Sequence, residues 1–255
     1  VDISVGVASS YVRVVDNGAG ISRSGLMLLG ERHATSKSGN LDLMDSGTEN
    51  YGFHGETLCS ISNVSLLEIL TRVHGKPNGY KKVIKESKCL FIGISDDRQA
   101  VGTTVTVRDI FYNQPVRRKH MESSSNKMLN AVKMAILRLA LINMGVSFVL
   151  VDRDSVEKIL HIEPSSSPST ILSRNFGIEN STSFLKLNLS SGELKLSGFI
   201  SGPRDVLSVK RIKYEFCPMF ILNLCCPRSF YDIFTQEQAR TFVEFKDWRP
   251  VLAFV

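Results

Sequence analysis

The sequence predicts an α+β protein of two domains. Its 255 residues exceed one average domain, and 43% hydrophobic against 22% charged residues is ordinary globular usage. Short β-branched runs and helical patterns occur in both halves, and the turn-forming segment Pro164–Pro168 separates them. We therefore expect an N-terminal domain at residues 1–163 and a smaller α+β domain at residues 164–255.

Composition limits the possible partners only weakly. The formal net charge of +6 favours polyanionic partners, but a solvated basic surface without a partner gives the same charge. The five cysteines form no spaced metal pair and their odd number fits disulfides poorly, so we expect reduced thiols. No apolar run approaches the roughly 20 residues of a membrane helix, so no membrane partner is expected. A strand pattern begins at Val1 itself, which suggests a missing front end.

The first elements surround a glycine-containing turn. Tyr11–Val15 is rich in β-branched residues and predicts a strand that runs into the turn Asp16–Gly20. Ser22 is then a candidate N-cap for a helix of about two turns. The polar segment Ser36–Asn50 has no periodicity, and a loop of that length inside a domain is usually a functional lid or disordered.

The remaining elements follow from local patterns of hydrophobicity. In the first domain we expect helices at Glu56–Ser62 and Asn126–Ile142 and strands at Ser65–Thr71, Tyr80–Lys85 and Val101–Arg108. In the second we expect a helix at Ser169–Phe176 and strands at Phe184–Leu189, Glu193–Ser201, Met219–Cys225 and Thr241–Phe245.

The turn carries residues suited to an adenine base. Adenine offers a hydrogen-bond donor at its exocyclic position, so the acceptor-only carboxylate of Asp16 at a strand end can read it. Gly18 and Gly20 lack Cβ atoms and let the backbone lie close to a base or phosphate. Taken alone, this pattern is also an ordinary turn.

Three further segments strengthen the prediction of an ATP site. Gly52 and Gly55 precede the helix that begins near Glu56, and free N–H groups at a helix start suit phosphates. Thr35–Lys37 offers two hydroxyls and an ammonium group. Thr103 can complete a hydrogen-bond network around Asp16. Each segment is weak alone, but their joint order and spacing are specific.

These strings, with Glu31–Lys37 (ERHATSK) and Phe111–Lys119 (FYNQPVRRK), resemble the MutL family of DNA mismatch-repair ATPases. The last two strings separate MutL proteins from gyrase, Hsp90 and histidine kinases, which share only the nucleotide-site motifs. The resemblance covers essentially the whole chain. Around Val107–Met121 and Ser197–Pro203 it is most similar to the plant form of the third eukaryotic class, which is associated with meiotic crossing-over.

The resemblance implies a fold and a set of binding residues. The fold is the Bergerat-type ATPase sandwich, followed by a domain like ribosomal protein S5 domain 2. Asp16 binds adenine partly through water, Gly18 and Gly20 shape the pocket, and Thr103 supports it. The remaining implied contacts to ATP are at the lid start, the phosphate-wrapping segment and a second-domain cation: Thr35, Ser36, Lys37, Gly52, His54, Gly55, Glu56, Thr57, Leu58 and Arg240.

Departures from the family pattern bear on catalysis. In the family, a helix before the first strand supplies a Glu that activates water and an Asn that holds Mg²⁺; both are absent here, so we expect no catalytic residue or metal ligand in this chain. His54 replaces a usual Arg, and Arg240 stands at the position of a Lys. A segment near residues 213–218 is expected to be deleted.

The resemblance implies a nuclear protein of DNA mismatch repair or meiotic recombination whose nucleotide state gates dimerisation and DNA handling. Its implied partners are mismatched DNA or recombination intermediates, a second MutL homologue as heterodimer, and MutS-type proteins, without a nuclease metal site in this chain. One alternative is a non-hydrolysing module that binds DNA or a partner. Another is a kinase or chaperone of the same fold, which Phe111–Lys119 disfavours. Arg117–Lys119 fits either a solvated surface or a DNA contact.

Overall fold

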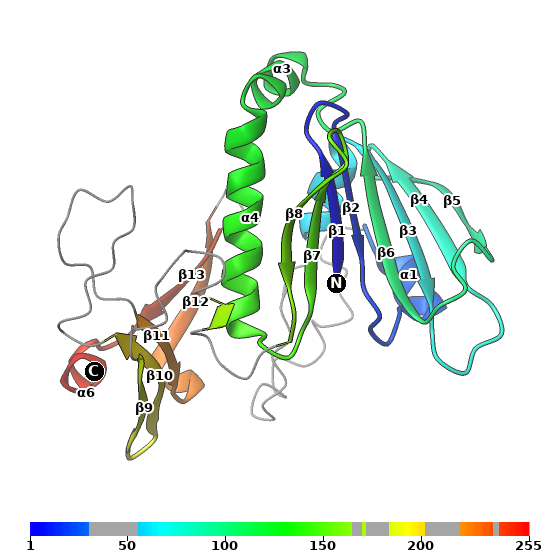
Figure 1. The fold of residues 1–255 in the computed structure, drawn as a ribbon. Helices are drawn as coiled ribbons and strands as arrows, with labels where there is room; N and C mark the ends of the chain where they lie inside the picture. The colour runs from blue at the N-terminus through cyan, green and yellow to red at the C-terminus, as the bar shows by residue number, and fades with distance from the viewer. Residues whose placement is uncertain (31–55, 165–169, 172–183, 202–219, 237–239, 255) are drawn as a thin grey trace. The chain divides into compact units, whose positions relative to one another are not determined.

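The computed structural model describes residues 1–30, 56–164, 170–171, 184–201, 220–236 and 240–254. The chain divides into two compact units, Val1–Pro164 and Ser165–Val255, which are considered separately below. Both units mix helices and strands, which confirms the α+β expectation (Figure 1). Among the described residues, no helix has the length and apolar character needed to cross a membrane.

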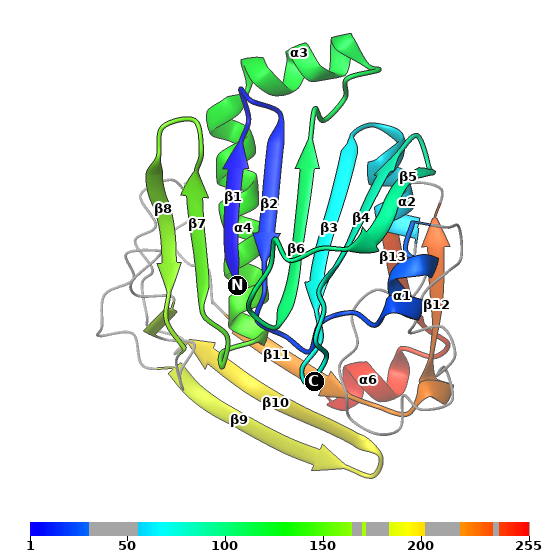
Figure 2. The ribbon, with the colours of Figure 1, turned by 90° about the vertical axis from the view of Figure 1, so that its right-hand side faces the viewer.

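The first unit is built on one eight-stranded sheet (Figure 2). The strand order is β5-β4-β3-β6-β2-β1-β7-β8. Neighbouring strands are antiparallel except β1 and β7, which are parallel. The strands are β1 (Asp2–Gly6), β2 (Tyr11–Val15), β3 (Leu66–Arg72), β4 (Tyr80–Lys85), β5 (Lys88–Ile94), β6 (Gly102–Arg108), β7 (Phe148–Asp152) and β8 (Glu157–Ile162).

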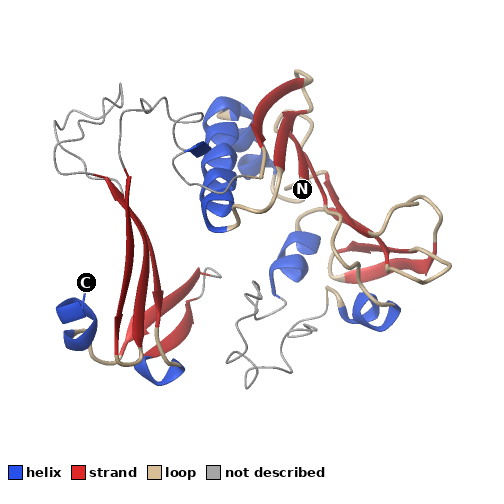
Figure 3. Ribbon diagram, turned by 60° about the horizontal axis from the view of Figure 1, so that its bottom comes forward, coloured by secondary structure: helices blue, strands red, loops and turns tan. Residues whose placement is uncertain are grey.

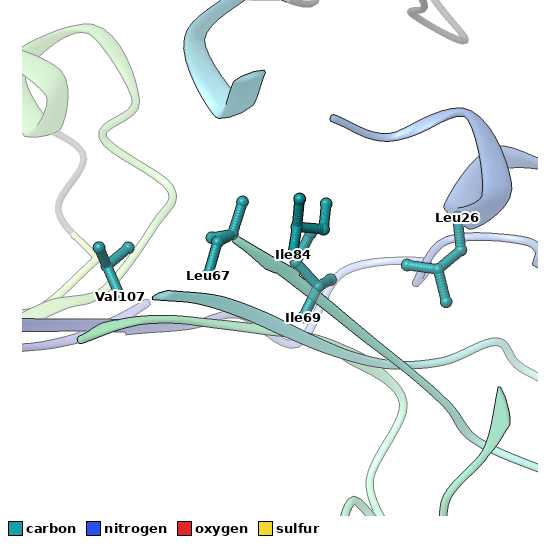
Figure 4. Packing of buried hydrophobic residues seen from close by; sticks show 5 residues of the cluster. All are labelled: Leu26, Leu67, Ile69, Ile84 and Val107. Carbon is teal, nitrogen blue, oxygen red and sulfur yellow. The ribbon is translucent and has the colours of Figure 1, made fainter. Parts of the chain in front are cut away.

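Among the described residues of this unit, four helices accompany the sheet: α1 (Arg23–Leu28), α2 (Glu56–Asn63), α3 (Pro115–Ser123) and α4 (Ser125–Ile142). Helices α1 and α2 pack against β3 and β4, and α4 packs against β7 and β8. The first of these interfaces holds the main core, in which buried side chains from the sheet meet α1 (Figure 4). The cluster consists of Leu26, Leu67, Ile69, Ile84 and Val107.

Local sequence chemistry explains the helix that follows the turn. The Ser22 hydroxyl accepts a hydrogen bond from the N–H of Gly25 at 3.1 Å, which confirms the predicted N-cap. Leu26 is fully buried, whereas Leu28 is 47% exposed, so only part of the expected apolar stripe faces the core. The C-terminal end of α1 is held by Lys82 of β4. Its ammonium donates to the carbonyls of Met27 and Leu29 at 2.6 and 2.7 Å.

The described part of the second unit contains two small antiparallel sheets (Figure 3). One has the order β11-β10-β9, and the other is a hairpin of β12 and β13. The predicted strands are confirmed to within two residues, whereas β12 and the last helix were not expected. The elements are β9 (Phe184–Ser191), β10 (Leu194–Ser201), β11 (Phe220–Cys225), η2 (Arg228–Phe230), β12 (Tyr231–Gln236), β13 (Arg240–Phe245) and α6 (Arg249–Phe254). Most of the expected helix at Ser169–Phe176, and the deletion near residues 213–218, lie outside the described residues.

Candidate nucleotide site

The Asp16 turn is fixed by hydrogen bonds across the sheet. β2 pairs with β6, and the ladder continues past Val15 because the N–H of Asp16 donates to the carbonyl of Thr103 at 2.9 Å. The N–H of Thr103 donates back to Asp16 Oδ1 at 3.1 Å, and the N–H of Gly18 donates to the same oxygen at 2.8 Å. Oδ1 is therefore fully engaged, whereas Oδ2 has no hydrogen bond among the described residues. The turn thus presents a carboxylate oxygen of fixed orientation that can accept a bond.

Two glycines are required by close backbone contacts at this turn. Gly20 has φ +77°, and a Cβ added to it would lie 2.3 Å from the carbonyl oxygen of Arg72. Gly102 has φ +120°, and its Cβ would lie 2.3 Å from the carbonyl oxygen of Asp16. Any other residue at either position would push the turn away from β3 or β6. Gly20 was a predicted pocket residue, and its role here is to let the turn rest against the end of β3.

Two buried threonine hydroxyls lie beside the turn. Thr71 on β3 is opposite Thr103 on β6, and their Oγ1 atoms are 3.4 Å apart. Thr71 Oγ1 accepts from the N–H of Ile21 at 2.7 Å and so ties the end of the turn to β3. Thr71 was not expected at the site. Its hydroxyl meets that of Thr103 only through the pairing of β3 with β6, which no local pattern in the sequence specifies.

An arginine that the sequence did not suggest also reaches the turn. Arg98 belongs to the loop between β5 and β6. Its Nη2 donates to the carbonyl of Asp16 at 2.5 Å and to that of Val101 at 3.0 Å, and its Nη1 donates to Thr104 Oγ1 at 2.6 Å. No motif in its neighbourhood marks it, because it meets Asp16 across 82 residues of sequence.

The other predicted nucleotide residues are placed only in part. Leu58 packs with the hydrophobic core, so its side chain is directed away from solvent, whereas Thr57 is exposed at the start of α2. Glu56 is the first residue of α2, and Arg240 is the first residue of β13 in the second unit. Six predicted residues lie outside the described part of the chain: Thr35, Ser36, Lys37, Gly52, His54 and Gly55. Within the described ranges, no group of three or more His, Cys, Asp or Glu side chains could hold a metal ion.

The segment Phe111–Lys119, one of the strings that resemble MutL proteins, leads from β6 into α3. Its first part is anchored beside α2, because the N–H of Phe111 donates to the carbonyl of Val64 at 2.7 Å. Its second part forms the start of α3, which buries no residue. Arg117 and Lys119 are exposed on α3. A role of these cations in DNA contact stays a prediction.

Sequence comparison finds relatives among DNA-repair proteins. The chain is 48% identical over 260 residues to the DNA mismatch repair protein MLH3 of Arabidopsis thaliana. This alignment covers 100% of this chain and 22% of that protein. It is 32% identical over 207 residues to the DNA mismatch repair protein MutL of Chromohalobacter salexigens, covering 80% of this chain and 31% of the relative. The chain thus spans less than a third of the length of these relatives. No family model matches it.

Comparison of structures supports the fold. The N-terminal domain of a DNA repair protein matches with a TM-score of 0.73 and 21% identity, over 99% of this chain and 85% of that structure. The Aquifex aeolicus MutL ATPase domain complexed with ADP matches with a TM-score of 0.54 and 24% identity, over 78% of this chain and 67% of that structure. Together with the large sheet of the first unit, these matches confirm the predicted Bergerat-type ATPase sandwich.

Proposed function

Because this chain belongs to the MutL family of DNA mismatch-repair proteins, we propose that its first unit binds an adenine nucleotide at the Asp16 turn. The unit is then the nucleotide-sensing part of a mismatch-repair protein. The geometry of one carboxylate carries the proposal: two backbone N–H groups hold Asp16 Oδ1 at 2.8 and 3.1 Å, which leaves Oδ2 to accept a bond from the base.

This arrangement favours adenine over guanine. The 6-amino group of adenine is a donor and pairs with a carboxylate oxygen, whereas guanine presents a carbonyl oxygen at that position and repels it. The fixed backbone around Asp16 means that the acceptor is already oriented before a ligand arrives, so little freedom is lost on binding. The match to a MutL ATPase domain complexed with ADP supports the same ligand class.

The wider activity follows from the family. We propose that nucleotide binding gates N-terminal dimerisation with a second MutL homologue and the handling of mismatched DNA or recombination intermediates. MutS-type proteins are the proposed upstream partners, and the nucleus is the proposed location. Mg²⁺ is the proposed companion of ATP, held by its phosphates. The named relatives favour this repair function over the alternative of a module that only binds DNA or a partner.

Calorimetry with ADP tests the assignment of Asp16. Asp16→Asn keeps an acceptor oxygen for the two backbone N–H groups and places an amide donor where the base needs an acceptor. We expect it to weaken ADP binding by about 10- to 100-fold, the usual effect of an unpaired polar group at a recognition site. Asp154→Asn is a matched control, because Asp154 Oδ2 also accepts a backbone N–H, that of Ala8 at 2.8 Å.

The two variants separate the possible outcomes. Asp154→Asn is expected to bind ADP as tightly as the unmodified chain. If Asp16→Asn binds ADP with unchanged affinity, Asp16 does not read the base. If the unmodified chain binds neither ADP nor ATP, the proposed function itself is wrong.

A further inference from the structure

We propose that Arg98 is a positioning residue for base recognition, which holds the Asp16 turn in the orientation that reads adenine. This inference rests on the proposed function and adds to it a residue of the loop between β5 and β6. Arg98 would not touch the nucleotide. It would act through the backbone of Asp16, whose carbonyl it contacts at 2.5 Å.

The guanidinium joins three segments of the chain at the turn, through two backbone carbonyls and one side-chain hydroxyl. Nη2 bridges the carbonyls of Asp16 and Val101, and Nη1 donates to the hydroxyl of Thr104. Val101 ends the loop and Thr104 lies on β6, so a single planar group links the end of β2, the loop and the central strand. A planar fork with several donors can do this, whereas the point charge of a lysine cannot span the same acceptors.

The contact controls the peptide that follows Asp16. The carbonyl of Asp16 and the N–H of Asn17 belong to one rigid peptide plane, so fixing the carbonyl fixes the direction in which the chain enters Asn17 and Gly18. The N–H of Gly18 is one of the two donors that hold Asp16 Oδ1. Loss of the Arg98 contact would let this peptide rotate, and the carboxylate would lose one of its two supports.

Gly102 leaves room for the contact between the Arg98 guanidinium and the carbonyl of Asp16. A Cβ at Gly102 would lie 2.6 Å from Arg98 Nη2 and 2.3 Å from the carbonyl oxygen of Asp16. The absence of a side chain at Gly102 therefore creates the space in which the guanidinium and the carbonyl meet. The glycine that opens β6 and the arginine that precedes it form one structural unit with the turn.

The loop that carries Arg98 is itself ordered by hydrogen bonds. The N–H of Ser95 donates to the carbonyl of Gly79 at 3.0 Å, the N–H of Asp97 to Ser95 Oγ at 3.3 Å, and Gln99 Nε2 to the carbonyl of Asp96 at 2.9 Å. These bonds hold the loop at the ends of β4 and β5. Arg98 thus reaches the turn from a supported position, as a positioning role requires.

The Arg98 guanidinium is not fully paired. Arg98 Nε is buried and, within the residues the structure describes, has no hydrogen-bond partner. Burying an unpaired N–H of a charged group is unfavourable, so it offsets part of the free energy of folding that the other hydrogen bonds of the guanidinium contribute. The other nitrogens make three hydrogen bonds at the turn or beside it, so the bonds that offset this cost are those that position the turn.

The test compares two ligands that differ in one group. ADP carries the 6-amino group that Asp16 would read, and purine riboside 5′-diphosphate lacks it. Calorimetry on the full 255-residue chain gives both dissociation constants for the unmodified chain and for Arg98→Ala, Arg98→Lys and Arg153→Ala. Arg153 is a control of equal charge whose guanidinium lies 3.7 Å from the Tyr11 ring, at the start of β2 rather than its end.

We expect Arg98→Ala to weaken ADP binding by about tenfold or more, because small misplacements of a recognition group have effects of this order. Binding of the purine analogue should change by less than about threefold, so the preference for ADP collapses. Arg98→Lys should recover only part of the preference. Arg153→Ala should leave it intact. If Arg98→Ala does not fold, the same preference measured on Arg98→Lys decides the question.

The outcomes distinguish the two proposals. Equal weakening of both ligands by Arg98→Ala would mean that the residue serves general stability, and unchanged affinity for both ligands would mean that it has no part in binding; both overturn the positioning role and leave the nucleotide site standing. If the unmodified chain binds ADP no better than the analogue, adenine reading by Asp16 fails and the role of Arg98 fails with it.

Discussion

Replacing Gly20 by alanine tests whether the turn depends on its contact with the end of β3. Gly20 and Gly75 have similar backbone conformations, with φ of +77° and +71°. An added Cβ at Gly20 would lie 2.3 Å from the carbonyl oxygen of Arg72, whereas one at Gly75 would meet nothing within 4 Å. The two substitutions therefore share the cost of a positive φ and the effect on the unfolded chain, and they differ in the steric contact.

The magnitudes follow from these contacts. Gly75→Ala should cost about 1–2 kcal/mol, the strain of alanine in a left-handed conformation. Gly20→Ala carries the same strain, and its overlap with a carbonyl forces a backbone shift worth about 1–3 kcal/mol. That shift would also stretch the 2.7 Å bond from the Ile21 N–H to Thr71 Oγ1, worth about 1 kcal/mol. We expect Gly20→Ala to lose about 2–4 kcal/mol more free energy of unfolding than Gly75→Ala.

Hydrogen exchange of peptides from β3 and β6, measured across a urea series, is the suitable assay. Trp248, the one tryptophan of the chain, lies in the second unit, so its fluorescence does not report on the turn. With a slope of about 2 kcal/mol per M, the expected difference separates the two midpoints by about 1–2 M urea. Midpoints that agree within about 0.25 M urea, or about 0.5 kcal/mol at that slope, would refute the steric argument, because the strain common to both variants would then account for the whole effect.

Two further predictions concern charged side chains. Lys82→Met should lower the free energy of unfolding by about 1–3 kcal/mol, because it leaves two carbonyls at the end of α1 without this donor. Lys76→Met on the exposed β3–β4 loop should change stability by under about 0.5 kcal/mol in the same urea titration, and equal losses would contradict the capping role. Arg249 lowers the pKa of Asp247 through hydrogen bonds from its side chain and its backbone N–H. The ion pair therefore stabilises the folded state above the ordinary carboxyl pKa, and this stabilisation is lost as pH falls through the lower pKa that Asp247 has in the folded state. Arg249→Gln should therefore raise the pKa of Asp247 in an NMR titration, and an unchanged midpoint would contradict the assigned cause.

Local patterns identified those elements whose neighbours in sequence decide their structure. β-branched content predicted the strand Tyr11–Val15, and capping chemistry predicted the Ser22 cap. An apolar stripe predicted the helix that the structure places at Ser125–Ile142. The strand Lys88–Ile94 was missed because it lies at the sheet edge and is exposed on both faces, so it shows no alternation. The helix Pro115–Ser123 buries no residue and therefore has no periodic signal.

The same distinction holds at the site. Asp16, Gly18 and Gly20 could be predicted because they lie within one stretch of five residues and their turn chemistry is local. Thr71 and Arg98 could not, because only the pairing of β3, β6 and β2 brings them to the turn. In the second unit, Trp248 contacts Phe245 edge-on with ring centroids 4.7 Å apart and is 49% exposed, a partial burial that its residue type alone does not predict.

The pairing of β2 with β6 also determines when the turn can form during synthesis. Asp16 is separated by 87 residues from the amide of Thr103 that orients its carboxylate. At about 5–20 residues per second, a ribosome needs roughly 4–17 s to make that stretch, during which the strand before the turn has no partner on that side. A ligand of this turn can therefore stabilise only chains that have already completed β6, and it offers no protection to the newly made strands that most need it.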